Sequence, residues 1–167
     1  VLMKILWAAR LARPDLSRAT SKLTTKVQSW SCNDDKRLRR IAEYMQYSMD
    51  WALQGFACDW SSEIELWLFC DADLAGDPES SKSSSGAWLV LVGPSTWIPL
   101  TWLFVKQTAT AKSTTEAESV SLVYALLHEA LPTLDLIELI FQRKVVFRIK
   151  EDNSATIKVL RKGYSSK

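Results

Sequence analysis

The sequence predicts an α/β protein: a small helical unit, then a mixed sheet of three antiparallel strands followed by a helix, a fourth strand and a final helix. Two observations lead to this fold class. Residues 1–60 carry apolar side chains at helical spacing, whereas from Ile64 onward short apolar runs alternate with turns rich in Gly, Ser and Pro. With 167 residues, 47% of them hydrophobic, the chain can bury a core in one domain or in one domain with an appendage.

Three helices are expected in residues 1–60. The first spans residues 2–12 and ends before Pro14, whose ring disfavours helical geometry at the preceding residue. The second runs from about residue 15 to about residue 28, and the third begins near residue 33 and has ended by Gly55. Short polar residues that can cap a helix N-terminus stand at both starts. The candidate caps are Asp15 or Ser17 for the second helix and Asn33 or Asp34 for the third.

Basic residues are concentrated in the first quarter of the chain, although the net charge of +2 is too small to identify a partner. Such a cluster can meet phosphate, or it can form the solvated faces of helices, and both alternatives stay open. The cluster comprises Lys4, Arg10, Arg13, Arg18, Lys22, Lys26, Lys36, Arg37, Arg39 and Arg40.

The cysteines and the first residues indicate a reduced protein without a membrane partner. Cys32, Cys58 and Cys70 lack the spacing of metal ligands and cannot all pair within one chain. The apolar start of the chain is interrupted by Lys4 and Arg10 too early to span a bilayer. Because no initiator Met is present, we expect the chain to be a piece of a longer protein.

Three strands with short connections are expected after residue 64, which favours an antiparallel meander. The first is an apolar run from Leu66 that stops at Asp71 and Asp73, so it delivers two acids to the rim of the sheet. The Ser-rich stretch 80–86 then turns the chain into the second strand, residues 87–92. The third strand runs from residue 97 to residue 105.

A long helix follows, opened by Ser113 and Glu116 in the pattern of a capping box. Pro132 is expected to stop this helix, with a second short helix over residues 133–142. Residues 144–150 alternate like a half-buried strand and stop at Glu151-Asp152-Asn153. A last helix, residues 154–162, is expected to close at Gly163.

Three acids can converge in this arrangement. If the first and fourth strands are neighbours, Asp71 and Asp152 come together at one edge of the sheet. Glu118 is the preferred third acid, because Glu116 serves the capping box and the two side chains point about 200° apart around the helix. Three close carboxylates repel one another unless a cation lies between them, and all-oxygen ligands suit Mg²⁺ or Mn²⁺.

Five segments together resemble the ribonuclease H domain of copia-type retrotransposon polyproteins, and their order and spacing carry the resemblance. They are Phe69–Asp77, Lys82–Gly86, Thr101-Trp102 with Lys106-Gln107, Ala111–Glu118 and Glu151–Ala155. Residues 9–16 are similar to the segment that follows the polymerase palm in the same polyproteins. The resemblance implies that residues 1–60 are the helical tail of a reverse transcriptase, thumb-like or connection-like, and that residues 61–167 are an RNase H-like domain truncated at its C-terminus.

The resemblance also implies an activity: hydrolysis of the RNA strand of an RNA–DNA hybrid with two Mg²⁺ ions, for which Mn²⁺ is a possible substitute. Asp71 would bridge both ions, Glu118 would ligate one and help to place the water, and Asp152 would hold one. The implied partners are the hybrid and the remainder of the polyprotein, at an intracellular location that is cytoplasmic, associated with virus-like particles, or nuclear. Candidate contacts to the hybrid are Ser83, Ser84, Ser85, Gln107 and Asn153, of which Asn153 can alternatively cap the final helix.

One departure from the family leaves an alternative function open. The fourth acidic ligand of the family lies downstream of a His-containing segment, and this chain ends first. We therefore expect the fragment to be weakly active or inactive. The alternative is a catalytically decayed relic of the same polyprotein that binds nucleic acid or serves a structural role. An integrase-like nuclease fits less well, since the last acid of that family sits on a helix whereas Asp152 ends a strand.

Overall fold

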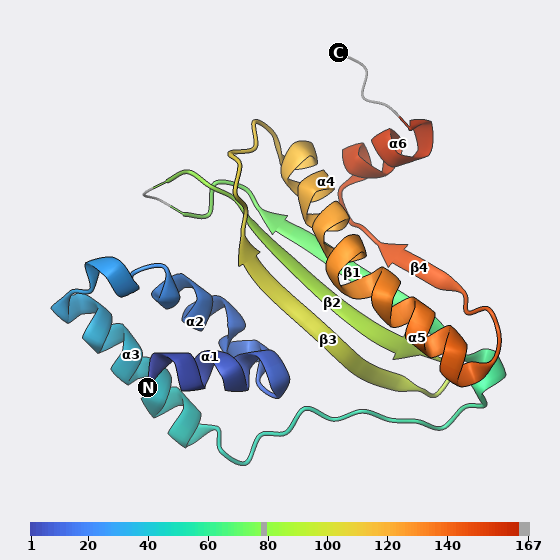
Figure 1. Cartoon of the computed structure of the whole chain (residues 1–167), viewed down its shortest axis with the longest axis horizontal. Coiled ribbons are helices and arrows are strands. Elements are labelled where there is room, and N and C mark those ends of the chain that lie inside the picture. The colour runs from blue at the N-terminus through green and yellow to red at the C-terminus, as the bar shows by residue number, and fades with distance from the viewer. Residues whose placement is uncertain (78–79, 164–167) are drawn as a thin grey trace. The chain divides into compact units, whose positions relative to one another are not determined.

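The structure is a computed structural model that describes residues 1–77 and 80–163. The chain divides into two compact units, Val1–Gln54 and Gly55–Lys167, and each unit is described by itself below. The first unit is helical, and the second contains the sheet and the remaining helices (Figure 1).

The first unit consists of α1 (Leu2–Leu11), α2 (Ser17–Thr24) and α3 (Cys32–Tyr47), joined by single 3₁₀ turns. The expected start of α3 at Asn33 or Asp34 is wrong by two to three residues. Ser31 is the N-cap, and Asp34, in the third helical position, accepts a hydrogen bond of 3.1 Å from the Ser31 backbone N–H. The apolar faces of the three helices bury a small core of Leu2, Ile5, Ala9, Leu16, Leu23 and Ile41.

The second unit is built on a four-stranded mixed sheet in the order β3-β2-β1-β4. Its strands are β1 (Glu65–Asp73), β2 (Ser84–Val92), β3 (Trp97–Lys106) and β4 (Phe147–Lys150). The pairs β1–β2 and β2–β3 are antiparallel, and β1–β4 is parallel. The predicted fold class is thereby confirmed, and the arrangement is consistent with an RNase H-like fold.

Strand β2 begins earlier than expected. Ser84, Ser85 and Gly86 belong to the strand and not to the preceding turn, because they pair with Asp73, Ala72 and Asp71 on β1. Ser and Gly have low strand propensity, but pairing with a neighbouring strand outweighs this local preference. The longer β2 continues the sheet along the acidic end of β1.

Pro132 does not stop the helix after β3, and the prediction of two separate helices is wrong. Helix α4 (Thr114–Ala125) continues through a π-helical turn (Leu126–Ala130) into α5 (Leu131–Phe141), with Pro132 near the start of α5. A proline cannot donate the i to i−4 hydrogen bond of an α-helix, and π turns occur as local bulges where that pattern is interrupted. The helix Thr114–Phe141 is long and apolar enough to cross a membrane by length and composition alone, since a stretch of 18 residues within it has a mean hydropathy of 1.4.

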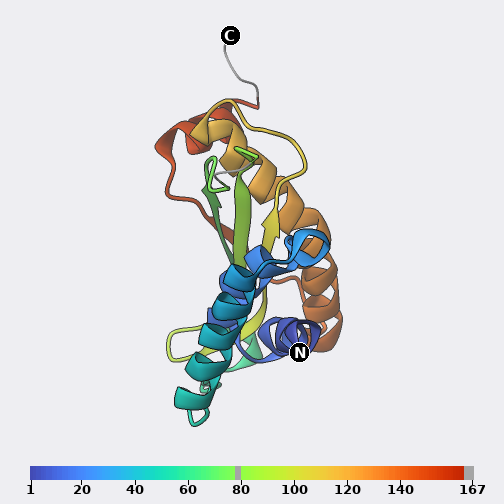
Figure 2. The same cartoon turned by 90° about the vertical axis from the view of Figure 1, so that its left-hand side faces the viewer.

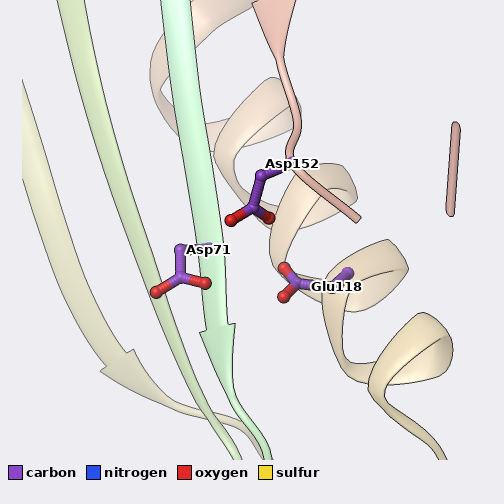
Figure 3. Close-up of side chains that lie close together, drawn as sticks. All are labelled: Asp71, Glu118 and Asp152. Atoms are coloured by element: carbon purple, nitrogen blue, oxygen red, sulfur yellow. The ribbon is translucent and has the colours of Figure 1, made fainter. Parts of the chain in front are cut away.

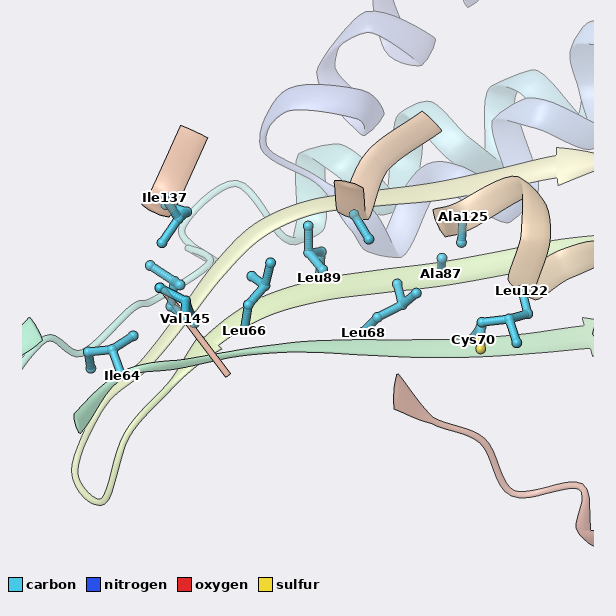
Figure 4. Packing of buried hydrophobic residues seen from close by; sticks show 12 residues of the cluster. Ile64, Leu66, Leu68, Cys70, Ala87, Leu89, Leu122, Ala125, Ile137 and Val145 are labelled. Atoms are coloured by element: carbon cyan, nitrogen blue, oxygen red, sulfur yellow. The ribbon is translucent and has the colours of Figure 1, made fainter. Parts of the chain in front are cut away.

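The main core lies between this helix and one face of the sheet. Leu66 and Leu68 of β1, Leu89 of β2, and Leu122 and Ala125 of α4 belong to one buried cluster (Figure 4). All five are at most 1% exposed. Figure 2 shows the long helix running along this face of the sheet. The core therefore fixes α4 over β1 and β2, at the end of the sheet where β1 reaches Asp71.

The final helix, α6 (Ser154–Lys162), begins and ends as predicted. Asn153 caps it, with its Oδ1 accepting hydrogen bonds from the backbone N–H groups of Ala155 at 3.0 Å and Thr156 at 3.1 Å. Gly163 closes it with φ 74°, in the left-handed region that favours glycine.

Candidate metal site

Parallel pairing of β1 with β4 brings the first two acids to the same place. Phe69 pairs with Lys150 in this ladder, so Asp71 and Asp152 each follow two residues later along neighbouring chains. Successive residues of parallel strands rise by the same amount, which keeps the two positions level at the edge of the sheet. The expectation that the first and fourth strands are neighbours is therefore confirmed.

Helix α4 supplies the third acid. Ser113 caps the helix, as predicted, by accepting a hydrogen bond of 3.2 Å from the Glu116 N–H through its hydroxyl. One turn beyond Glu118, the Ser121 hydroxyl donates a hydrogen bond of 2.8 Å to the backbone carbonyl of Asp71. This bond ties α4 directly to the acidic end of β1. Glu118 faces the sheet and is buried, whereas Glu116 is exposed.

The carboxylates of Asp71, Glu118 and Asp152 converge (Figure 3). One oxygen from each lies within 4.8 Å of the others, and Glu118 is buried while the two aspartates are exposed. Among the residues that the structure describes, none of the three forms an ion pair with a lysine or arginine. The group is thus an uncompensated cluster of negative charge, open on the aspartate side.

Glu118 experiences the strongest electrostatic effect in the cluster. Burial, followed by the negative charges of Glu151, Asp71 and Asp152, raises the pKa of its carboxyl to about 7, against a hydrogen bond from the Ala72 backbone that lowers it. Its Oε2 is buried and has no hydrogen-bond partner within the described part of the chain. A buried carboxylate oxygen without a donor is costly unless a proton or a cation compensates it.

The residues present fit a divalent cation. The unpartnered Glu118 oxygen faces two further carboxylates, and oxygen ligands of this kind are those that Mg²⁺ and Mn²⁺ prefer. The acidic triad Asp71, Glu118 and Asp152 could therefore hold a metal ion.

Glu151 is a further acid at this place that the sequence did not single out. Its carboxylate accepts a hydrogen bond of 3.0 Å from the Asn153 N–H and one of 3.5 Å from the Cys70 thiol. Burial, followed by the charge of Glu151, raises the pKa of Cys70 to about 12. The thiol is thus held in its protonated form. Only the parallel pairing reveals this contact, because Cys70 and Glu151 are 81 residues apart.

The residues predicted to contact nucleic acid mostly serve internal contacts. Ser83, Ser84, Ser85 and Gln107 are buried. The Gln107 amide donates hydrogen bonds to the Ser85 hydroxyl at 3.0 Å and to the Ala117 carbonyl at 2.9 Å, which joins the strand ends to α4. Asn153 is the cap of α6. Contact of these five residues with a hybrid stays a prediction.

Asp73, the second acid at the end of β1, lies outside the converging triad. Its carboxylate lies close to Gly76, where an added Cβ would come within 2.3 Å of Asp73 Oδ2. A larger residue at position 76 would therefore displace the Asp73 carboxylate. Nearby, Asp77 forms an ion pair with Lys106 of β3 and accepts a hydrogen bond from Ser80, so the loop after β1 is anchored to the opposite edge of the sheet.

Comparisons with known proteins identify two kinds of relative. The retrovirus-related Pol polyproteins from transposons RE2 and RE1 of Arabidopsis thaliana are 30% and 29% identical to this chain over 106 residues, which is 64% of the chain. The chain spans only 7% of the length of these polyproteins. No family model matches the chain, and no solved structure matches it.

The second kind of relative is the secreted RxLR effector protein 161 of Plasmopara viticola. It is 30% identical over 118 residues, which cover 71% of this chain and 78% of that protein. The chain therefore belongs to the same family as this effector protein, and it is similar to a part of the retrovirus-related Pol polyproteins.

Proposed function

We propose that residues 61–167 are a retrotransposon ribonuclease H, which hydrolyses the RNA strand of RNA–DNA hybrids with the help of two Mg²⁺ ions. The convergence of Asp71, Glu118 and Asp152 within 4.8 Å carries the proposal. Similarity to two polyproteins supports it, since their names describe them as retrovirus-related Pol polyproteins from transposons. We further propose that residues 1–60 are the tail of the preceding reverse transcriptase and that the protein acts inside the cell.

Each acid has a separate task in this proposal. Asp71 would bridge both ions, Asp152 would hold one, and Glu118 would hold one and orient the attacking water. When bound, the ions would activate that water and stabilise the leaving oxygen of the phosphodiester. The exposed aspartates leave the site open to a nucleic-acid strand, and the 2′-hydroxyl group is the feature that could distinguish RNA from DNA.

A second candidate is a non-catalytic module of the same origin. The relative from Plasmopara viticola favours this candidate. The alignment covers 78% of that relative, and its name describes a secreted effector and not a polyprotein. The two candidates share the fold and differ in whether the triad performs chemistry.

Cleavage of a labelled RNA–DNA hybrid in Mg²⁺ or Mn²⁺ tests the proposal. Slow cleavage that is lost in Asp71→Asn and retained in Asp73→Asn is expected, because Asp73 lies at the same strand end but outside the triad. A contaminating nuclease would be unaffected by either substitution. If the chain binds Mn²⁺ at the triad yet leaves the hybrid intact at every metal concentration, the second candidate is correct.

A further inference from the structure

The outward face of the long helix Thr114–Phe141 is apolar along most of its length. Its inward face packs on the sheet, but from residue 120 to residue 140 most of the exposed positions also carry apolar side chains. We call the large apolar ones the helix stripe, and each is between 38% and 67% exposed. The helix stripe comprises Val120, Val123, Tyr124, Leu127, Leu131, Leu136, Leu139 and Ile140.

The helix stripe is large for a surface that faces water. Side chains of this kind at these exposures present on the order of 700 Å² together, more than the about 300–600 Å² of the largest apolar patch on a typical monomer. A specific protein interface buries about 800 Å² on each partner. The stripe alone therefore comes close to the area that a stable pair of proteins needs.

The π-helical turn in the middle of the helix helps to keep the stripe on one side. The stripe follows rows of residues four apart, and such rows drift around an α-helix that has 3.6 residues per turn. Hydrogen bonds in the Leu126–Ala130 turn run from i to i+5, so this turn contains more residues and offsets part of the drift. Leu127 before the bulge and Leu139 after it both remain well exposed.

Half of the stripe is also symmetric along the helix. Val120 and Ile140 lie ten residues before and after Ala130, and Tyr124 and Leu136 lie six residues before and after it. If a second copy of the helix runs antiparallel with a two-fold axis near Ala130, Val120 of one copy meets Ile140 of the other. Such self-complementary pairing is what an isologous dimer interface requires.

The charges around the stripe match the same arrangement. Glu116 lies in the first turn of the helix and Lys144 lies three residues beyond its end at Phe141, so an antiparallel pair of helices brings the acid of one copy to the same end as the base of the other. The Lys144 side chain is 93% exposed and is oriented by a bond of 2.6 Å to Glu138. The two ionisable side chains exposed within the stripe, His128 and Asp135, come within about one turn of each other across the pair, since helix residues rise by about 1.5 Å each.

We propose that two copies of this chain associate through the helix stripe, antiparallel and with the two-fold axis near Ala130. The occupant of the stripe is thus a second copy, and the interface buries the apolar rows at its centre while the Glu116–Lys144 pairs lie at its rim. Nothing in this proposal depends on nuclease activity, because the stripe lies on the side of the helix opposite the Glu118 carboxylate, which faces the sheet.

Sedimentation of the intact chain gives the first test. The unchanged protein is expected to sediment as a dimer at tens of micromolar, and the double variant Leu127→Glu with Leu139→Glu as a monomer. Leu160→Glu, an exposed leucine on α6, is the matched control and is expected to remain dimeric. Far-UV circular dichroism checks that each variant is folded. A monomeric unchanged protein, or a folded double variant that still dimerises, would overturn the proposal.

Disulfide crosslinking tests the orientation without destabilising charges. The exposed Cys32 and Cys58 are first replaced by Ser. Leu131→Cys, next to the axis, is expected to form a disulfide-linked dimer by itself. Val120→Cys is expected to link only when mixed with Ile140→Cys, because the two Val120 positions are about 30 Å apart in the antiparallel pair. Self-linking of Val120→Cys would indicate parallel helices and contradict the proposal, as would a monomer that binds neutral phospholipid vesicles through the stripe.

Discussion

Asp71 and Asp152 occupy equivalent positions at the ends of the parallel strands β1 and β4, each two residues past the Phe69–Lys150 pair. The register of one short parallel ladder therefore sets the separation of two acids that are far apart in the sequence. Because β4 has only four residues, a shift of this ladder by one residue would turn Asp152 away from the other two carboxylates. The expected effects of single substitutions follow from this geometry.

Removing any one acid of the triad is expected to weaken Mn²⁺ binding. Asp71→Asn, Glu118→Gln and Asp152→Asn each replace a charged oxygen ligand with a neutral amide, and we expect affinity to fall by at least about tenfold, as it does when even indirect support of a metal is lost. Isothermal titration calorimetry provides the measurement. Asp73→Asn is the control and is expected to bind as the unchanged protein does. Equal affinities throughout would show that the ion binds elsewhere.

The stability of the metal-free protein is expected to fall as the pH rises through neutrality. The pKa of Glu118 is raised from 4.5 to about 7 in the folded chain, so this group contributes stability that is fully present below pH 4.5 and is lost as the pH rises through 7. Allowing for partial solvation, the loss amounts to about 2 kcal/mol. Urea unfolding in EDTA at pH 5 and pH 8 measures the free energy of unfolding at both ends of this range.

Glu118→Gln is the control for this pH dependence, since a neutral amide does not titrate. The free energy of unfolding of this variant should lack the Glu118 contribution. The difference in stability between the variant and the unchanged protein should therefore shift in favour of the variant as the pH rises. Saturating Mn²⁺ should restore the free energy of unfolding of the unchanged protein at pH 8 and should raise that of the variant less. Parallel pH profiles for the two proteins would refute the assignment.

Ser121→Ala is expected to weaken the attachment of α4 to the end of β1 that carries Asp71. The substitution removes the hydroxyl that donates to the Asp71 carbonyl at 2.8 Å, and losing such a bond costs about 1 kcal/mol. Ser119→Ala is a matched control on the same helix, because the Ser119 hydroxyl bonds to the Thr115 carbonyl one turn earlier, at 2.7 Å, within the helix itself. We expect Mn²⁺ affinity to decrease in the first variant and to stay the same in the second. A decrease of equal size in both would point to helix propensity as the cause.

Leu68→Ala is expected to destabilise the second unit by about 2–5 kcal/mol, since a fully buried leucine leaves a cavity when it is truncated. Leu160→Ala, at a position that is 47% exposed, should change the free energy of unfolding by about 0.5 kcal/mol or less. Denaturant unfolding followed by tryptophan fluorescence compares the two. Similar losses in both variants would mean that the core does not lie where the burial indicates.

The sequence predicted the elements that have clear local patterns. Alternation, caps and glycine stops located the strands, the Ser113 cap and the end of α6 at Gly163. It also selected Glu118 over Glu116, since the two positions lie on different sides of a helix and one of them was needed for capping. The convergence of the triad needed one further assumption, that the first and fourth strands pair, and the structure confirms it.

Local patterns failed where contacts distant in the sequence determine the outcome. Pro132 predicted a helix stop, but the helix continues past this residue through the π turn and packs on the sheet. Ser84 and Ser85 predicted a turn, but pairing with β1 makes them part of a strand. Glu151 has no local signal that distinguishes it from a solvent-exposed acid, and only the approach of Cys70 from another strand shows where its carboxylate points.

The parallel ladder between β1 and β4 also has a consequence for how the protein matures. Its two strands are joined by two hairpin strands and a long helix, so the acids cannot meet until almost all of the second unit has been synthesised and folded. A shorter nascent chain would possess Asp71 and Glu118 but no complete binding place for an ion. Binding of Mn²⁺ would then show that β4 has paired with β1. The bound ion would also stabilise this pairing, which is the shortest strand pairing in the sheet.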